Sequence, residues 1–238
     1  MRKDSLEEND TCGEYSRVYL YICSVIAKIT CLTAFFYFKI FCHGKIVNEE
    51  IIRRNMEKGF VLISNHVSYM DWLVLRGYFL YCHQIKMIFL AKNKLFHHRI
   101  WKYTVIGSRG VRISDTGTKI YSHKEYKRYL EEKYVGVFPE GTRSFTGEIN
   151  NTHGGIIKIA AKKNVPIIPI NLEGFYNVLP RDKKIPRPYP CRIIVGNECR
   201  FDYENVRRKS EAELGKCVAE MLTSLEYTDI RELNTLKS

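Results

Sequence analysis

The sequence lacks the residue spacing that metal sites and disulfide frameworks require. Its eight cysteines contain no Cys-x2-Cys pair, and its seven histidines show no metal-ligand spacing. Half of the cysteines fall in or near the apolar N-terminal region, and we interpret them as small hydrophobic side chains. We therefore predict no metal site and a reducing compartment.

Zinc-finger, basic-zipper and aromatic RNA-binding signatures are absent too, as are internal repeats and low-complexity linkers. The chain is nevertheless basic, with 38 Lys and Arg against 26 Asp and Glu and a formal net charge of +12. Because its basic clusters are scattered, we expect membrane lipid rather than nucleic acid as the anionic partner. The length of 238 residues predicts one domain with a sizeable core and a short appendage. The sequence carries no signal for an oligomeric state.

The first candidate site follows a short apolar run at residues 60–63, which predicts a buried strand. His66 would then leave the carboxyl end of this strand, where open α/β sheets place their ligands. Asp71 lies five positions later, and residues five apart on one helix point about 140° apart. The two can meet if His66 lies in a loop and Asp71 in the first helical turn, with Ser68 as the N-cap.

In that arrangement Asp71 accepts one ring N–H of His66, and the other ring nitrogen is left free as a base. The alternative is that Asp71 only caps the helix and His66 is an ordinary loop histidine.

The second candidate site is the run from Phe138 to Ser144, which reads FPEGTRS. Residues 135–138 predict a strand, which Pro139 ends by removing a backbone donor. The glycine permits a tight turn, and Arg143 presents a planar fork suited to phosphate. The alternative is a solvated turn with a salt bridge between Glu140 and Arg143.

A third segment, residues 165–170, reads VPIIPI and is too apolar for a surface loop. Its two prolines predict an interrupted or edge strand that lines a pocket wall.

Three blocks in this order resemble those of the glycerolipid acyltransferase family: Asn65-His66 with Asp71, the run from Phe138 to Ser144, and residues 165–170. The resemblance covers residues 60–172 and is strongest for the 1-acylglycerol-3-phosphate acyltransferases. It implies an α/β fold with a central, mostly parallel or mixed sheet flanked by helices. It also implies that His66 is the general base, that Asp71 orients it, and that glycerol phosphate is bound by Glu140, Gly141, Thr142 and Arg143.

The implied reaction transfers a fatty acyl group from an acyl thioester to the free hydroxyl of lysophosphatidic acid, which makes phosphatidic acid for phospholipid biosynthesis. The resemblance implies no cofactor, and acyl-CoA or acyl carrier protein would supply the acyl group as co-substrate. We expect direct transfer, with a covalent route through Ser64 or Ser68 as the alternative. Other acceptors (glycerol 3-phosphate or a lysophospholipid) and a catalytically silent membrane-binding homologue remain open.

The chain departs from the family pattern between its first two matching blocks. The family places an arginine six residues after a glycine, but the sixth residue after Gly107 is Ile113. Arg112 is therefore predicted to bind phosphate, with Arg109 as the alternative. Two residues after Lys92, Lys94 stands where the family has a glutamate. Lys92 is predicted either to be a further phosphate contact or to be a surface lysine. No role is assigned to His153.

The N-terminal region divides into a polar leader, residues 1–16, and a hydrophobic membrane-associated helix, residues 17–45; the acyltransferase catalytic domain would be residues 46–238. The leader is acidic and has no small-residue cleavage site, so we expect no cleaved signal peptide. Arg17, Lys28 and Lys39 are eleven apart and therefore share one side of the helix.

A basic stripe on an apolar helix favours a helix that lies in one leaflet of a membrane. A full span and a buried soluble helix are the alternatives. If the helix spans, the excess of Lys and Arg after it places the catalytic domain in the cytoplasm.

The remaining pattern alternates strands and helices. It predicts further strands at residues 85–90 and 191–195, and helices at residues 72–80, 118–133, 156–163 and 211–225.

Overall fold

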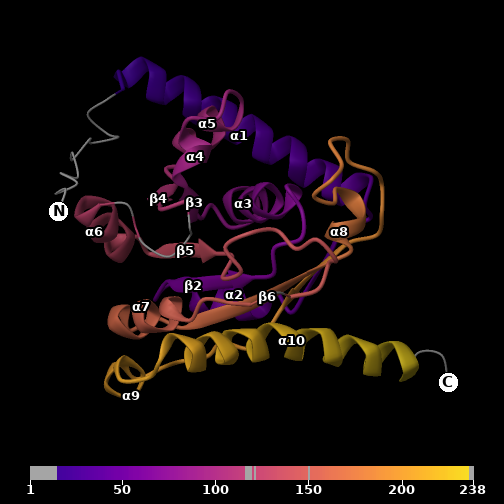
Figure 1. Ribbon diagram of the computed structural model, residues 1–238. Helices are drawn as coiled ribbons and strands as arrows, with labels where there is room; N and C mark the ends of the chain where they lie inside the picture. The colour runs from indigo at the N-terminus through magenta and orange to yellow at the C-terminus, as the bar shows by residue number, and fades with distance from the viewer. Residues whose placement is uncertain (1–14, 116–119, 121, 150, 236–238) are drawn as a thin grey trace.

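The computed structural model describes residues 15–115, 120, 122–149 and 151–235 (Figure 1). All but the last two residues of the predicted polar leader therefore lie outside the described part of the chain. The described residues form a seven-stranded sheet with helices on both faces. This confirms the predicted α/β class.

The sheet is mixed. Neighbouring strands are parallel, except that β6 and β7 are antiparallel. In spatial order the strands are β1 (Lys45–Val47), β7 (Arg192–Val195), β6 (Ile167–Glu173), β2 (Phe60–Ser64), β5 (Tyr134–Val137), β3 (Ile88–Lys92) and β4 (Val111–Ile113).

The predicted strand at residues 60–63 is β2, whose five residues are all buried between β5 and β6. Parallel strands end at one edge of a sheet, so β2, β5 and β3 deliver their following loops to the same place. This edge receives both candidate motifs.

The edge-strand prediction for residues 165–170 is wrong, because β6 lies inside the sheet between β7 and β2. The reason is local to Pro169. Its carbonyl oxygen accepts the N–H of Gly196 at 2.8 Å, one residue beyond the end of β7. The missing N–H of Pro169 points to the same side, where Gly196 follows the last residue of β7, so the proline leaves at most one hydrogen bond unmade at the end of that ladder.

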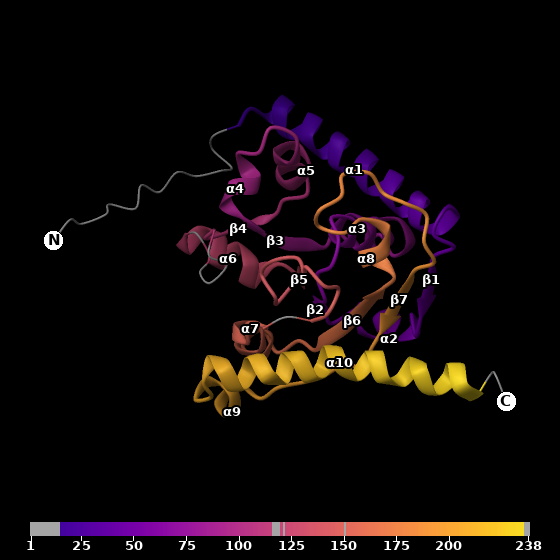
Figure 2. The ribbon, with the colours of Figure 1, turned by 45° about the vertical axis from the view of Figure 1, so that its right-hand side comes forward.

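Helices cover both faces of the sheet (Figures 1 and 2). One face carries α3 (Met70–Cys82), with α1 (Arg17–Ile40) and α5 (Trp101–Gly107) above it. The opposite face carries α7 (Gly155–Lys163) and the long α10 (Glu211–Thr235). The other helices are α2 (Glu50–Asn55), α4 (Asn93–Phe96), α6 (His123–Glu131), α8 (Phe175–Val178) and α9 (Tyr203–Arg207).

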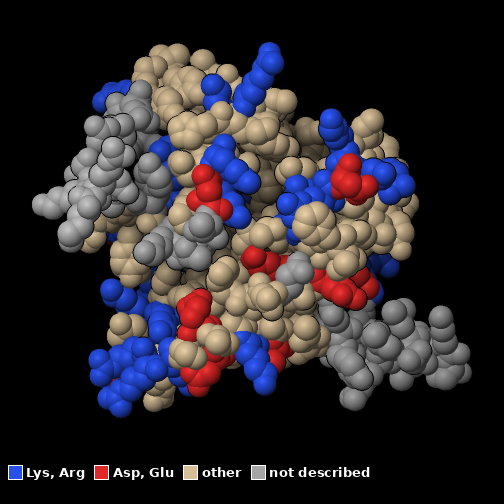
Figure 3. Space-filling view, viewed as in Figure 1, with Lys and Arg blue, Asp and Glu red and all other residues tan. Residues whose placement is uncertain are grey.

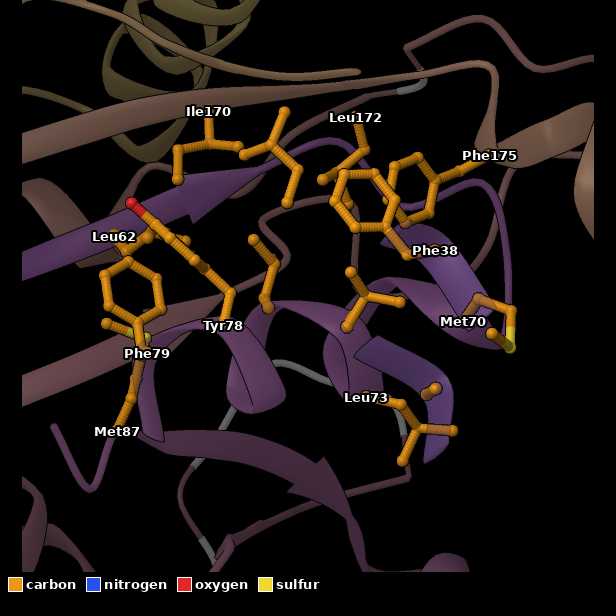
Figure 4. Close-up of a cluster of buried hydrophobic side chains, with 14 of the residues drawn as sticks. Phe38, Leu62, Met70, Leu73, Tyr78, Phe79, Met87, Ile170, Leu172 and Phe175 are labelled. Atoms are coloured by element: carbon orange, nitrogen blue, oxygen red, sulfur yellow. The ribbon is translucent and has the colours of Figure 1, made fainter. Parts of the chain in front are cut away.

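The hydrophobic core on the α3 side includes part of the N-terminal helix (Figure 4). Phe38 of α1 stacks on Phe175 with ring centres 5.6 Å apart, and Tyr78 and Phe79 of α3 are fully buried nearby. The helix expected as an appendage therefore shares a core with the rest of the chain.

The inner side of α1 consists mainly of small residues, namely Cys23, Ala27, Cys31 and Ala34, followed by Phe38. Small side chains let α1 approach its neighbours closely. A Cβ added to Gly107 would lie 1.9 Å from the carbonyl oxygen of Cys23, and one added to Gly77 would lie 2.5 Å from that of Cys31. The helix consequently lies flat along α3 and α5.

The outer side of α1 is apolar, with Val18, Tyr21, Ile29, Phe36 and Ile40 all exposed. The three predicted stripe residues are exposed too and follow one flank of this surface: Arg17, Lys28 and Lys39. By length and composition α1 could cross a membrane. Figure 3 shows a largely uncharged surface with a few basic side chains at the top of the molecule, where α1, α4 and α5 lie.

Candidate active site

His66 and Asp71 meet as the sequence predicts. His66 lies in the loop after β2, and Asp71 lies in the first turn of α3, with Asp71 Oδ2 2.8 Å from His66 Nδ1. The same oxygen accepts the N–H groups of Val67 at 2.7 Å and Ser68 at 2.8 Å. Since Oδ2 accepts from two amides, it also accepts from His66, and Nδ1 carries the ring proton. Nε2 is then left as an acceptor.

Although Tyr69 is the residue that directly precedes α3, Ser68 caps the helix. Its hydroxyl accepts the N–H of Met70 at 3.1 Å and donates to the carbonyl of Leu179 at 2.9 Å. With the bond from its N–H to Asp71, the geometry is that of a capping box. Local sequence therefore fixes the position of the carboxylate beside His66.

The turn after β5 clamps the histidine loop from the other side. The N–H of His66 donates to Glu140 Oε1 at 2.7 Å, and the carbonyl of His66 accepts the N–H of Ser144 at 2.7 Å. The His66 ring stacks on Phe138 with centres 4.3 Å apart. Gly141, with φ of +65°, supplies the left-handed residue that this turn needs. These contacts make the loop and the turn one rigid unit.

A cavity of about 600 Å³ opens beside His66. Its polar lining gathers at the carboxyl ends of the strands and includes His66, Lys92, Thr142, Arg143, His153 and Arg181. Its apolar lining includes Leu90, Val105, Ile113, Val137, Ile156 and Ile159. The site thus joins a basic, hydrogen-bonding region to space suited to a hydrocarbon chain.

Four Lys and Arg side chains line the cavity: Lys92, Lys94, Arg143 and Arg181. The guanidinium carbon of Arg143 lies 3.3 Å from the ring centre of Tyr69. Burial lowers the pKa of Arg143, and the charge of Arg181 lowers it further, against opposing effects of Tyr69 and Asp71. Burial also lowers the pKa of Lys92, followed by the effect of Lys94. Both groups are therefore held as cations in a place that disfavours positive charge.

Two predicted phosphate-binding residues lie elsewhere. Arg112 is buried, with its guanidinium carbon 4.7 Å from the ring centre of Phe96, and it does not line the cavity. Strand alternation explains this, because the next residue, Ile113, points to the cavity instead. Arg109, the alternative, pairs with Glu132 at 3.1 Å and is also outside the lining. Neither position gives a direct contact to a ligand in the cavity.

The remaining predicted residues fall into two groups. Lys92, Gly141, Thr142 and Arg143 line the cavity. Glu140 does not, because it is buried and its carboxylate holds the backbone of His66. The substrate-binding roles stay predictions, and for Glu140 the contacts indicate a positioning role.

Two cavity residues were not assigned from sequence. The sequence indicates no role for Arg181 or for His153. The N–H of His153 donates to the carbonyl of Pro139, which holds it beside the FPEGTRS turn. Neither residue lies in a sequence motif, so no pattern in the sequence indicates that it reaches the cavity.

The described residues contain no group of three or more His, Cys, Asp or Glu side chains that could hold a metal ion.

Comparison with known proteins identifies the class. The family model named Acyltransferase matches residues 42–173, more than half of the chain. The chain therefore belongs to the acyltransferase family.

Several curated relatives carry the name 1-acyl-sn-glycerol-3-phosphate acyltransferase. A protein of this name from Cocos nucifera is 28% identical over 142 residues, which cover 56% of this chain and 43% of the relative. One from Borreliella burgdorferi is 27% identical over 115 residues, covering 47% of this chain and 44% of the relative. The chain spans less than half the length of these relatives.

The fold also matches a crystal structure, that of the 1-acyl-sn-glycerophosphate (LPA) acyltransferase PlsC from Thermotoga maritima. The TM-score is 0.62 at 22% sequence identity, over 87% of this chain and 79% of the other. At this identity the match establishes the fold.

Proposed function

We propose that this protein transfers a fatty acyl group from an acyl thioester to the free hydroxyl of lysophosphatidic acid and so makes phosphatidic acid. One observation carries the proposal: a histidine whose Nδ1 is held by a buried carboxylate lines a cavity beside a group of cations. A base suits the acceptor hydroxyl, and cations suit its phosphate. The names of the curated relatives support the same acceptor.

In the proposed mechanism, His66 Nε2 takes the proton of the acceptor hydroxyl as that oxygen attacks the thioester carbonyl. Asp71 stabilises the imidazolium that forms, because its Oδ2 lies 2.8 Å from Nδ1. The tetrahedral intermediate then collapses, the C–S bond breaks, and the leaving thiolate takes the proton from the imidazolium. The product ester and a free thiol are released.

The contacts of the nearby serines favour direct transfer over an acyl-enzyme. Ser64 and Ser68 are both 0% exposed. The hydroxyl of Ser64 donates to the carbonyl of Asn65, and that of Ser68 donates to the carbonyl of Leu179. A serine nucleophile must instead contact the base and reach the thioester carbon.

The acyl chain would occupy the apolar region of the cavity, between residues of α5, β4 and α7. We propose acyl-CoA or acyl carrier protein as the donor, since both present an acyl thioester and neither requires a bound cofactor.

We further propose that α1 lies in one leaflet of a membrane with its outer side toward the lipid. Packing of its inner side from Cys23 to Phe38 against the domain supports this orientation over a span. The basic flank of Arg17, Lys28 and Lys39 would then meet anionic headgroups. If α1 instead spans the membrane, the excess of Lys and Arg after it would place the domain in the cytoplasm.

An acceptor panel tests the proposal. Detergent-solubilised protein is incubated with a labelled long-chain acyl-CoA and with lysophosphatidic acid, glycerol 3-phosphate or lysophosphatidylcholine. We expect phosphatidic acid to be the main product. A preference for either of the other acceptors would contradict the proposed acceptor, and transfer to none of them would support a silent homologue.

A further inference from the structure

Arg181 comes from a segment that is distant in sequence from both motifs, but it is attached to the second one. It follows β6 and α8, and its Nη1 donates to Thr142 Oγ1 at 3.2 Å and to the carbonyl of Arg143 at 3.1 Å. Its guanidinium carbon lies 3.9 Å from the ring centre of Phe145. The planar group is therefore held in place at the cavity, although it is exposed.

The partners of Arg181 leave its charge uncompensated. Its acceptors are a hydroxyl and a carbonyl, both neutral. Within the described part of the chain, no carboxylate forms an ion pair with Arg181, Arg143 or Lys92. Glu211 also lines the cavity, but its Oε1 accepts the N–H groups of Gly154 and Gly155.

The charge of Arg181 acts on the two neighbouring cations, Lys92 and Arg143. It lowers the pKa of both, although Asp115 raises that of Lys92 and Tyr69 raises that of Arg143 by more. Nη1 of Arg143 is buried and has no hydrogen-bond partner among the described residues. Cations that lie close together repel each other, and an anion that binds between them offsets this repulsion. A phosphomonoester offers enough oxygens for all three.

We propose that Arg181 is a third phosphate-binding residue, which acts with Arg143 and Lys92 and makes the site selective for acceptors that carry a phosphomonoester. This inference rests on the proposed function for the identity of the acceptor. The anion site itself can be measured without any acyl transfer.

The competing explanation is purely structural: Arg181 only braces the turn through Thr142 and Arg143. The two explanations differ for an acceptor without phosphate. Loss of a brace disturbs the turn beside His66 and slows transfer to every acceptor alike. Loss of a phosphate contact weakens binding of lysophosphatidic acid and leaves transfer to a monoacylglycerol, which has the same free hydroxyl, nearly unchanged.

The first measurement is binding of glycerol 3-phosphate by calorimetry to the full-length, detergent-solubilised protein. Arg181→Gln is compared with wild type and with Lys184→Gln, a substitution of an exposed lysine on the same loop outside the cavity. Losing a hydrogen bond to a charged group predicts an affinity lower by about tenfold or more in Arg181→Gln. The control should bind like wild type. Equal binding by all three, or no binding by wild type, would overturn the proposal.

The second measurement is the ratio of kcat/KM for lysophosphatidic acid to kcat/KM for the monoacylglycerol. We expect this ratio to fall about tenfold or more in Arg181→Gln and to recover in part in Arg181→Lys, which restores the charge. An unchanged ratio with both rates lowered would show that Arg181 is only a brace. If wild type acylates neither acceptor, the proposed function fails, and the binding measurement still decides the anion site.

Discussion

Asp71 Oδ2 lies 2.8 Å from His66 Nδ1 while it also accepts two backbone N–H groups of the loop between them. One carboxylate oxygen therefore fixes the orientation of the ring and the shape of the loop that carries it. Asp71 is completely buried, so this arrangement is shielded from water.

Asp71→Asn should lower kcat by about 10²–10⁴-fold, because an amide cannot stabilise the imidazolium as a carboxylate does. The KM for the acceptor should change far less, since Asp71 does not line the cavity. Steady-state kinetics measure both values, and Asp182→Asn serves as the control because that carboxylate is exposed and pairs with Lys183. Retention of more than about a tenth of wild-type kcat would contradict this role.

Glu140 should act through the backbone of His66. Glu140→Ala leaves the part-buried N–H of His66 without its acceptor, which predicts a loss of stability of about 1–3 kcal/mol and a lower kcat. Glu140→Gln keeps an acceptor oxygen and should retain clearly more activity. Denaturant unfolding and kinetics check the two effects. Equal loss in both variants, expressed mainly in KM, would instead support substrate binding by the Glu140 charge.

Membrane binding should depend on the outer side of α1. Phe36→Glu places a charge on the apolar surface and should reduce co-flotation with vesicles that contain anionic lipid. Its melting temperature should stay near that of wild type, since Phe36 is 53% exposed. Tyr203→Glu is a matched control, because Tyr203 is an exposed aromatic residue on α9. Undiminished flotation of Phe36→Glu would argue against lipid contact on this side.

The charge of Lys92 should lower the free energy of unfolding of the protein, although it supports phosphate binding. Its pKa is lowered chiefly by burial, so the unfolded chain holds the proton at pH values where the folded protein begins to release it. The contribution of Lys92 to the free energy of unfolding therefore rises with pH, up to the pKa of lysine in the unfolded chain, about 10.4. Lys92→Met should be more stable than wild type near pH 7, and the difference should shrink in alkaline buffer.

Thermal unfolding at several pH values measures the difference between Lys92→Met and wild type. The same variant should bind glycerol 3-phosphate more weakly. Greater stability together with unchanged binding would show that Lys92 is not a phosphate contact.

The sequence predicted the pairing of His66 with Asp71 because most determinants of its geometry are local. An apolar strand, a capping serine and a carboxylate three residues later are enough to predict that His66 and Asp71 meet, and long-range contacts of Ser68 and His66 then hold the loop. The predicted strand at residues 60–63 and the predicted helix at residues 156–163 were found for the same reason.

Features that depend on neighbouring strands were not predictable in this way. The place of Pro169 in a central strand follows from where β7 ends. Arg112 is buried on the side of a three-residue strand that faces away from the cavity, and the sequence does not show which side that is. Arg181 reaches the site only through the path of the chain after α8. The same holds for α1, whose packing on Gly77 and Gly107 no periodicity reveals.

The most direct test compares wild type with His66→Ala for transfer from a long-chain acyl-CoA to lysophosphatidic acid. We expect wild type to form phosphatidic acid and the variant to be slower by about 10²–10⁴-fold, with an unchanged circular dichroism spectrum. Wild-type rates in a folded His66→Ala protein would contradict the proposed role of His66 as the base.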